Sequence, residues 1–273
     1  QKGIGKKTVA KIFSQMLLCE QCRDEPCSRC KPCQLFSGGS NPDYQVIETD
    51  GASIGIEEIR NINNSIMIRP IYSKRKVFLI TDADKITIQA QNCLLKTLEE
   101  PPSYAVIILT ASKHEALLGT IRSRAIIYNF KKNTFAEVKG FLETHSCNTA
   151  ISLDFIAMYA DGIIGKAIEL ASSQEFSRLR DETINMLSNF HTSDPLALFE
   201  GFGFFEENKN HIDFIFDVML LYYRDLLILK KTRSETLLIN TDKKDIIVNS
   251  ARLFTVGALA EIIEIISSAM KDI

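Results

Sequence analysis

A cluster of cysteines early in the chain is the group of side chains most able to do chemistry. Five of the seven cysteines lie in residues 19–33, a segment with almost no apolar residues to form a core of its own. Four of them have the spacing of a tetrahedral thiolate site, with the predicted ligands Cys19, Cys27, Cys30 and Cys33. Zinc is the ion expected for four thiolates in a reduced compartment, and an iron–sulfur cluster is the chemical alternative. Because four protein ligands leave no open position for water, we predict a structural zinc site, with Cys22 as the alternative to Cys19.

A glycine-rich segment before the cysteines has the residue types of a phosphate-binding loop. Gly3-Ile-Gly5-Lys6 leads into residues 5–18, whose apolar spacing predicts a helix, and glycines at a helix N-terminus can bind an anion. A working loop ends Gly-Lys-Ser/Thr, because the hydroxyl binds magnesium. Here Lys7 follows, and Thr8 is one position too late. The candidate nucleotide-binding residues are Gly3, Gly5, Lys6 and Thr8. A plain helix start would have the same residues, and the sequence does not decide whether ATP binds.

A second difference from a working ATP site follows the apolar strand predicted at 76–81. An active ATPase with a phosphate loop has an acidic pair at this point, which holds magnesium and orients water. The corresponding pair in this chain is Thr81-Asp82. Two magnesium-binding positions therefore differ, Lys7 and Thr81, and we predict that the chain itself does not hydrolyse ATP.

Arg124 is the third candidate for a chemical role. It follows Ser123 on a predicted loop between a short helix at 117–122 and a strand at 125–130. An arginine at the rim of a parallel sheet can reach a γ-phosphate held by a neighbouring subunit, where such a residue raises the rate by about 10³–10⁵. From the residues alone, the alternatives are a solvated loop arginine, or Arg122 in the same role.

Strands and helices alternate through residue 130, which predicts a parallel α/β sheet. The predicted strands are 44–48, 76–81, 105–110 and 125–130, and the helices between them are 5–18, 56–67, 87–100 and 117–122. After residue 130 the pattern is helical only, at 135–144, 153–160, 164–172 and 214–230. We predict three domains: an α/β domain over 1–129 with the zinc module at 19–33, a small helical domain over 130–172, and a helical bundle over 173–273. No strand precedes Gly3, so we expect an α/β domain truncated at its N-terminus.

The overall composition is that of a soluble globular protein, with 45% hydrophobic and 24% charged residues. No apolar run reaches the roughly 18 residues that span a bilayer, and no membrane association is expected. The net charge of -2 gives no general electrostatic support to a nucleic-acid-binding module. The four histidines are scattered and have no triad or metal-ligand spacing.

Taken together and in this order, the motifs resemble the clamp-loader subunits of bacterial DNA polymerase III, a branch of the AAA+ family. The resemblance is most specific from Lys76 to Arg124, and in the C-terminal third it rests only on length and helical character. It implies an AAA+ α/β domain with an inserted zinc module, a small helical lid domain and a C-terminal helical collar for oligomerisation. The residues that carry it are Gly3-Ile-Gly5-Lys6, the four cysteines, Ile80-Thr-Asp-Ala-Asp84, Asn92-x-Leu-Leu-Lys-Thr-Leu-Glu-Glu-Pro-Pro102 and Ser123-Arg124.

Within that family, the departures at Lys7 and Thr81 resemble the delta prime subunit rather than the gamma/tau ATPase. The family's second sensor arginine falls near Gly165, where only Lys166 is basic. The resemblance implies that Arg124 is an arginine finger, which completes the ATP site of an adjacent gamma/tau subunit. It also implies a cytoplasmic bacterial hetero-pentamer with gamma/tau and delta subunits, which loads the β sliding clamp onto primed DNA. A gamma/tau-type ATPase subunit of the same clamp loader is the alternative.

Overall fold

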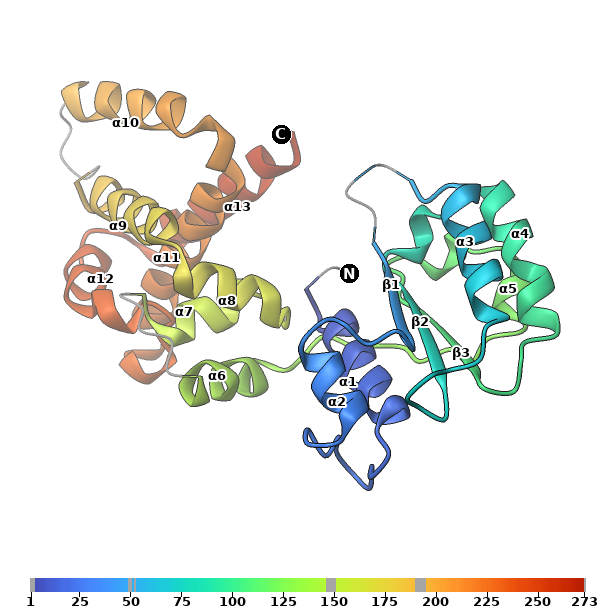
Figure 1. Cartoon of the computed structure of the whole chain (residues 1–273). Coiled ribbons are helices and arrows are strands. Elements are labelled where there is room, and N and C mark those ends of the chain that lie inside the picture. The colour runs from blue at the N-terminus through green and yellow to red at the C-terminus, as the bar shows by residue number, and fades with distance from the viewer. Residues whose placement is uncertain (1–2, 49–50, 52, 146–150, 190–194, 273) are drawn as a thin grey trace. The chain divides into compact units, whose positions relative to one another are not determined.

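The computed structural model describes residues 3–48, 51, 53–145, 151–189 and 195–272. The chain folds as two compact units, Gln1–Lys131 and Lys132–Ile273, which Figure 1 shows in blue to green and in green to red. This boundary lies close to the one predicted at residue 130. The further division of the helical part at residue 173 stays a prediction.

The first unit is built on a parallel sheet, as the sequence predicts. Its strands are β1 (Tyr44–Ile47), β2 (Lys76–Ile80) and β3 (Ala105–Leu109), in the order β1-β2-β3. The central strand β2 is buried along its whole length, because helices cover both faces of the sheet (Figure 1). Its alternate side chains divide between two clusters, as the two-residue period of a strand requires. Phe78 and Ile80 lie in one cluster and Val77 in the other.

The helices of the first unit follow the apolar spacing of the sequence closely. They are α1 (Lys6–Leu18), α2 (Lys31–Ser37), α3 (Ile56–Ile66), α4 (Ile88–Glu99) and α5 (Gly119–Arg122). The predicted helices 5–18, 56–67 and 87–100 are each confirmed to within one residue at either end. α5 begins two residues later than predicted, and α2 is a helix that the sequence did not predict. α2 begins immediately after Cys30, with Pro32 in its first turn, where proline's fixed φ is compatible with a helix.

The predicted buried strand at 125–130 is wrong. Within the described residues this segment pairs with no strand, and Ile126 and Tyr128 are 83% and 79% exposed. β3 is hydrogen-bonded to β2 on one side only, and residues 125–130 do not pair with its free edge. An apolar run becomes a buried strand only where a neighbouring strand satisfies its backbone N–H and C=O groups. Residues 125–130 form no such pairing with the described strands, so their backbone groups are not satisfied by a sheet.

The described part of the second unit contains helices joined by loops, and no strand. Its first three helices, α6 (Phe135–Thr144), α7 (Leu153–Tyr159) and α8 (Ile164–Ser172), match the predicted ranges to within one residue. The others are α9 (Gln174–Asn189), α10 (Pro195–Glu207), α11 (Ile212–Thr232), α12 (Lys244–Ala251) and α13 (Val256–Asp272). One buried cluster joins residues from early and late helices, among them Phe155, Val218 and Leu259. In the described part of the chain, no helix combines the length and the apolar character needed to cross a bilayer.

A buried polar network fixes the loop before α12 to two other helices. The Arg180 side chain is 1% exposed, and its Nη1 lies 2.7 Å from an Asp242 carboxylate oxygen. Its Nη2 also donates to the side-chain oxygen of Asn240 at 2.8 Å. The fully buried Asp225 of α11 accepts the backbone N–H groups of Ile239 and Asn240. α9 thereby binds side chains of this loop, and α11 binds its backbone.

Candidate metal centre and arginine loop

Two helix ends position the predicted metal ligands. Cys19 is the residue immediately after α1 and caps its C-terminus, because its backbone N–H donates to the carbonyls of Gln15 and Met16. Cys30 is the residue that precedes α2, and Cys33 lies in the first turn of that helix, where it is 1% exposed. Cys27 lies on the connecting loop. The fold therefore brings the ligands together by placing the end of one helix beside the start of the next.

The four sulfur atoms lie close enough together that they could bind one metal ion. The Sγ atoms of Cys19, Cys27, Cys30 and Cys33 all lie within 4.8 Å of one another, and Cys19 and Cys30 are 4.0 Å apart. A zinc ion with bonds of about 2.3 Å to four thiolates separates its sulfurs by about 3.8 Å. The donor set and its spacing thus fit Zn²⁺, and all four corners are protein thiols.

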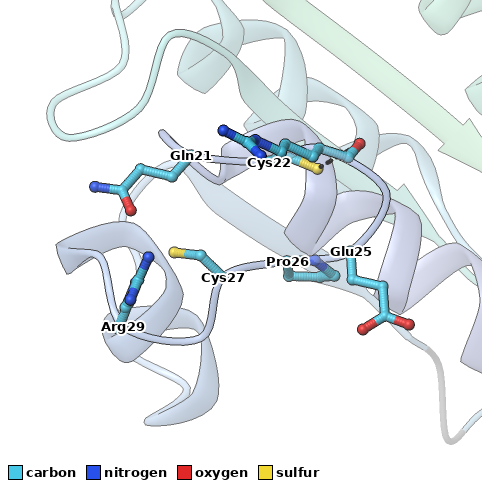
Figure 2. Close-up of a pocket in the computed structure, with 7 residues that line it drawn as sticks. Gln21, Cys22, Glu25, Pro26, Cys27 and Arg29 are labelled. Atoms are coloured by element: carbon cyan, nitrogen blue, oxygen red, sulfur yellow. Dashed lines mark hydrogen bonds between the residues drawn. The ribbon is translucent and has the colours of Figure 1, made fainter.

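Cys22 lies outside this group of four. Its Sγ contacts the carbonyl oxygen of Arg23 at 3.7 Å. Figure 2 shows that Cys22 and Cys27 line the same open hollow beside the cluster. Between the two cysteines that the sequence left open as the first ligand, the geometry thus favours Cys19. The complete lining of the hollow is Gln21, Cys22, Arg23, Glu25, Pro26, Cys27 and Arg29.

The protonation of the cysteines depends on local hydrogen bonds and burial. Backbone N–H groups of Arg29 and Cys30 lower the pKa of Cys27 to about 6, because they stabilise its thiolate. Burial raises the pKa of Cys33 to about 12 and also raises the pKa of Cys19. A divalent cation supplies the positive charge that buried thiolates need, so metal binding here would release protons.

The glycine-rich segment does form a tight loop at a helix N-terminus. Gly3 and Gly5 have φ angles of 80° and 97°, a region that glycine adopts without strain, and Gly5 directly precedes α1. Lys7, which stands at the expected hydroxyl position, makes an ion pair of 2.8 Å with Glu48 just after β1. Thr8 is exposed on the outer side of the first turn. A glycine loop at a helix N-terminus is therefore present, while the Lys7 ammonium is directed toward a carboxylate.

Thr81 and Lys166 have internal contacts in the structure. Thr81 is 7% exposed, and both its N–H and its hydroxyl contact the Ile47 carbonyl, at 3.0 and 3.4 Å. Thr81 thus continues the ladder between β2 and β1. In the second unit, Lys166 Nζ lies 3.8 Å from the centre of the Tyr159 ring. Burial raises the pKa of Asp217, and the Lys166 charge opposes this shift without cancelling it.

Arg124 lies just beyond α5 and is held by two acceptors. Its Nη1 donates to the Thr120 carbonyl at 3.0 Å, and its Nη2 lies 2.8 Å from Glu99 Oε1 at the end of α4. The Arg124 side chain is 36% exposed. Arg122 differs, because it is half-buried and its Nε is buried without a hydrogen-bond partner. The sequence shows Glu99 only as part of a motif. It does not indicate the pair of Arg124 and Glu99, because the two residues are 25 positions apart.

Sequence comparisons match this chain to subunits of DNA polymerase III. A profile described as "DNA polymerase III, delta subunit" matches residues 1–134. DNA polymerase III subunit delta' of Bacillus subtilis is 29% identical over 83% of this chain and 69% of its own length. The tau subunit of the same organism is 31% identical over 84% of this chain and 44% of its own length. Subunit delta' of Haemophilus influenzae is 34% identical over 46% of this chain.

A parallel α/β sheet, a glycine loop at a helix N-terminus and these similarities define the class. The chain belongs to the clamp-loader family of bacterial DNA polymerase III. Within that family it is most like the delta prime subunits. The chain spans about two thirds of the length of the Bacillus delta prime subunit, and only 39% of that of the Haemophilus one.

Proposed function

We propose that this chain acts as a non-hydrolysing, delta-prime-type subunit of a clamp loader, and that it supplies Arg124 to the ATP site of a neighbouring gamma/tau subunit. The observation that carries the proposal is the pair of departures at Lys7 and Thr81. The Lys7 ammonium pairs with Glu48, and the Thr81 hydroxyl contacts a backbone carbonyl of the sheet. Neither group is placed as a magnesium ligand, and magnesium is required for phosphoryl transfer in this class of site.

Arg124 supports the second half of the proposal. Its guanidinium is partly exposed on a short loop, and both of its terminal nitrogens are ordered by acceptors of the same unit. A planar, permanently charged fork of N–H donors matches the oxygens of a phosphate. Arg122 has less exposure for the same role, because its side chain is half-buried.

The cysteine cluster is proposed to hold one structural Zn²⁺ ion. Cys19, Cys27, Cys30 and Cys33 would bind it, and the ion would join the end of α1 to the start of α2. No residue of the cluster is proposed to take part in nucleotide chemistry. The remaining proposals follow from the family: gamma/tau and delta subunits as partners in a cytoplasmic hetero-pentamer, the β sliding clamp and primed DNA as its targets.

The alternative is a gamma/tau-type ATPase subunit of the same complex. It is favoured by the similarity to the Bacillus tau subunit, which is 31% identical over 84% of this chain. In pairwise identity this match is close to the 29% of the Bacillus delta prime subunit, so ATP turnover must separate the two proposals.

The decisive experiment measures ATP hydrolysis with and without partner subunits. The purified chain is expected to show no turnover, and Arg124→Ala is expected to lower the DNA-stimulated ATPase of the reconstituted clamp loader. At the affected site the loss should approach the factor of about 10³–10⁵ that such an arginine supplies, because the γ-phosphate loses its cationic partner. Arg124→Lys should be nearly as poor, since an ammonium lacks the fork geometry.

Arg122→Ala is the companion variant, because Arg122 is the rival candidate. A complex that loses its ATPase with Arg122→Ala, and keeps it with Arg124→Ala, would reassign the finger. Turnover by the chain alone that disappears in Lys6→Ala would establish the ATPase alternative instead.

A further inference from the structure

Arg124 is tied to a fixed point of the fold by one carboxylate. Glu99 is the last residue of α4, and its Oε1 lies 2.8 Å from Arg124 Nη2. The end of α4 is itself well anchored, because Thr97 is buried and its hydroxyl donates to the Asn63 side chain at 2.8 Å. Pro101 follows two residues later and prevents the helix from continuing. Glu99 therefore projects from a point that cannot easily move.

The second acceptor of Arg124 comes from a different element. Thr120 lies in α5, and its carbonyl accepts Arg124 Nη1 at 3.0 Å. The two contacts use one hydrogen on each terminal nitrogen. Each of these nitrogens carries two hydrogens in a planar guanidinium, so one on each remains for a further acceptor. A phosphate oxygen could thus be bound while both internal contacts persist.

These two contacts orient the Arg124 side chain but hold it only weakly. The side chains of Arg124 and Glu99 are 36% and 51% exposed, and an ion pair this open to water contributes little to the stability of a fold. It also holds the arginine too weakly to compete with a multiply charged phosphate. What the pair does supply is order, because a long flexible side chain is held in one direction before any partner arrives.

We propose that Glu99 is the positioning residue for Arg124: its carboxylate fixes the guanidinium so that the remaining N–H donors are preorganised for the phosphate of the neighbouring subunit. This inference rests on the proposed function of Arg124. Glu99 itself touches neither nucleotide nor metal, and it acts only through the arginine.

The test is a double-mutant cycle in the reconstituted clamp loader, with ATP hydrolysis measured across ATP concentrations on primed DNA. Glu99→Ala is expected to lower kcat about two- to fivefold, the size of effect expected from losing one exposed ion pair. KM for ATP should stay unchanged, because Glu99 does not contact the nucleotide. Glu99→Gln keeps an acceptor oxygen without the charge and should fall between Glu99→Ala and the wild-type protein. In an Arg124→Ala background, Glu99→Ala should have no further effect, since its partner is already gone.

Glu100→Ala is the matched control. Glu100 is the adjacent acid, it is exposed, and within the described part of the chain it makes no ion pair. Three results would each overturn the inference while the role of Arg124 stands. They are a wild-type kcat for Glu99→Ala, an equal loss of kcat in Glu100→Ala, and an equal loss of kcat when Glu99→Ala is added to the Arg124→Ala background. An Arg124→Ala complex with unchanged ATPase would instead overturn the proposed function itself. Thermal melting of each variant distinguishes these outcomes from misfolding.

Discussion

Cys19 and Cys22 lie three residues apart, yet the fold gives them different surroundings. Cys19 caps the C-terminus of α1 and belongs to the four-sulfur cluster, whereas Cys22 lies on the loop beside the open hollow. Spacing alone could not separate them, because each can be combined with the downstream Cys-x-x-Cys elements. What separates them is the direction in which the chain leaves α1, where Leu18 packs with Phe36 and Val77.

We expect Cys22→Ser to keep a full complement of metal and Cys19→Ser to lose most of it. Serine removes the soft thiolate ligand, and three thiolates bind zinc less tightly than four. Metal content of the purified variants, measured by elemental analysis, checks this directly. Cobalt substitution adds an independent measurement, because its visible spectrum reports tetrahedral sulfur coordination. Loss of metal in Cys22→Ser with retention in Cys19→Ser would reverse the assignment.

At the scale of elements, the sequence predicts those helices and strands whose formation depends on the local spacing of apolar residues. α6 and α8 were predicted at their observed limits because apolar residues recur at helical spacing, and α6 starts at the Thr134–Glu137 capping box. β2 was predicted because a continuous apolar run between polar residues suits a strand covered on both faces. The apolar pattern gave a wrong prediction where a strand depends on pairing with a neighbouring strand. Residues 125–130 have the same apolar character, but no described strand pairs with them.

Side-chain partners far apart in the sequence were not predictable in the same way. Arg124 and Glu99 are brought together by the end of α4 and the loop after α5. Arg180 and Asp242 are 62 residues apart and meet only when α9 packs beside the loop before α12. In the sequence, Arg180 is one of several charged residues on a helix and nothing marks it as buried. Such pairs depend on tertiary packing, which one sequence does not encode locally.

We expect Arg180→Ala to destabilise the protein by about 3 kcal/mol, because it leaves the Asp242 and Asn240 acceptors without their buried donor. The contact of the guanidinium with the Phe155 ring, at 4.5 Å, is lost as well. Denaturant unfolding at pH 7 measures the change. Arg178→Ala is the matched control on the same helix, since Arg178 is 58% exposed in its pair with Glu182. That variant should change the unfolding free energy by less than about 0.5 kcal/mol. Equal effects from the two substitutions would contradict a structural role for the buried network.

At the scale of the whole molecule, the two units have separate hydrophobic cores. In the described residues, the clusters around β2 draw only on the first unit, and the large helical cluster draws only on the second. The cysteine cluster belongs to the first unit. Its nearest core contacts run through Leu18 at the end of α1 and Phe36 in α2, which pack with Val77 of β2.

Removing the metal should therefore loosen one part of the first unit and leave the second unit unchanged. Without a cation, Cys33 is buried as a protonated thiol and Cys27 keeps its thiolate character, so the sulfurs lose the charge that holds them together. Backbone N–H groups of Cys27 and Cys30 donate to the sulfurs of Cys19 and Cys27, at 3.4 and 3.3 Å, and should exchange faster as the loop opens. Hydrogen exchange with a chelator present should rise over residues 19–37 and stay constant beyond residue 132. Cys19→Ser without chelator should give the same pattern. Uniform acceleration along the chain would mean that the metal stabilises the whole protein, and no change at all would mean that the four thiols hold no structural metal.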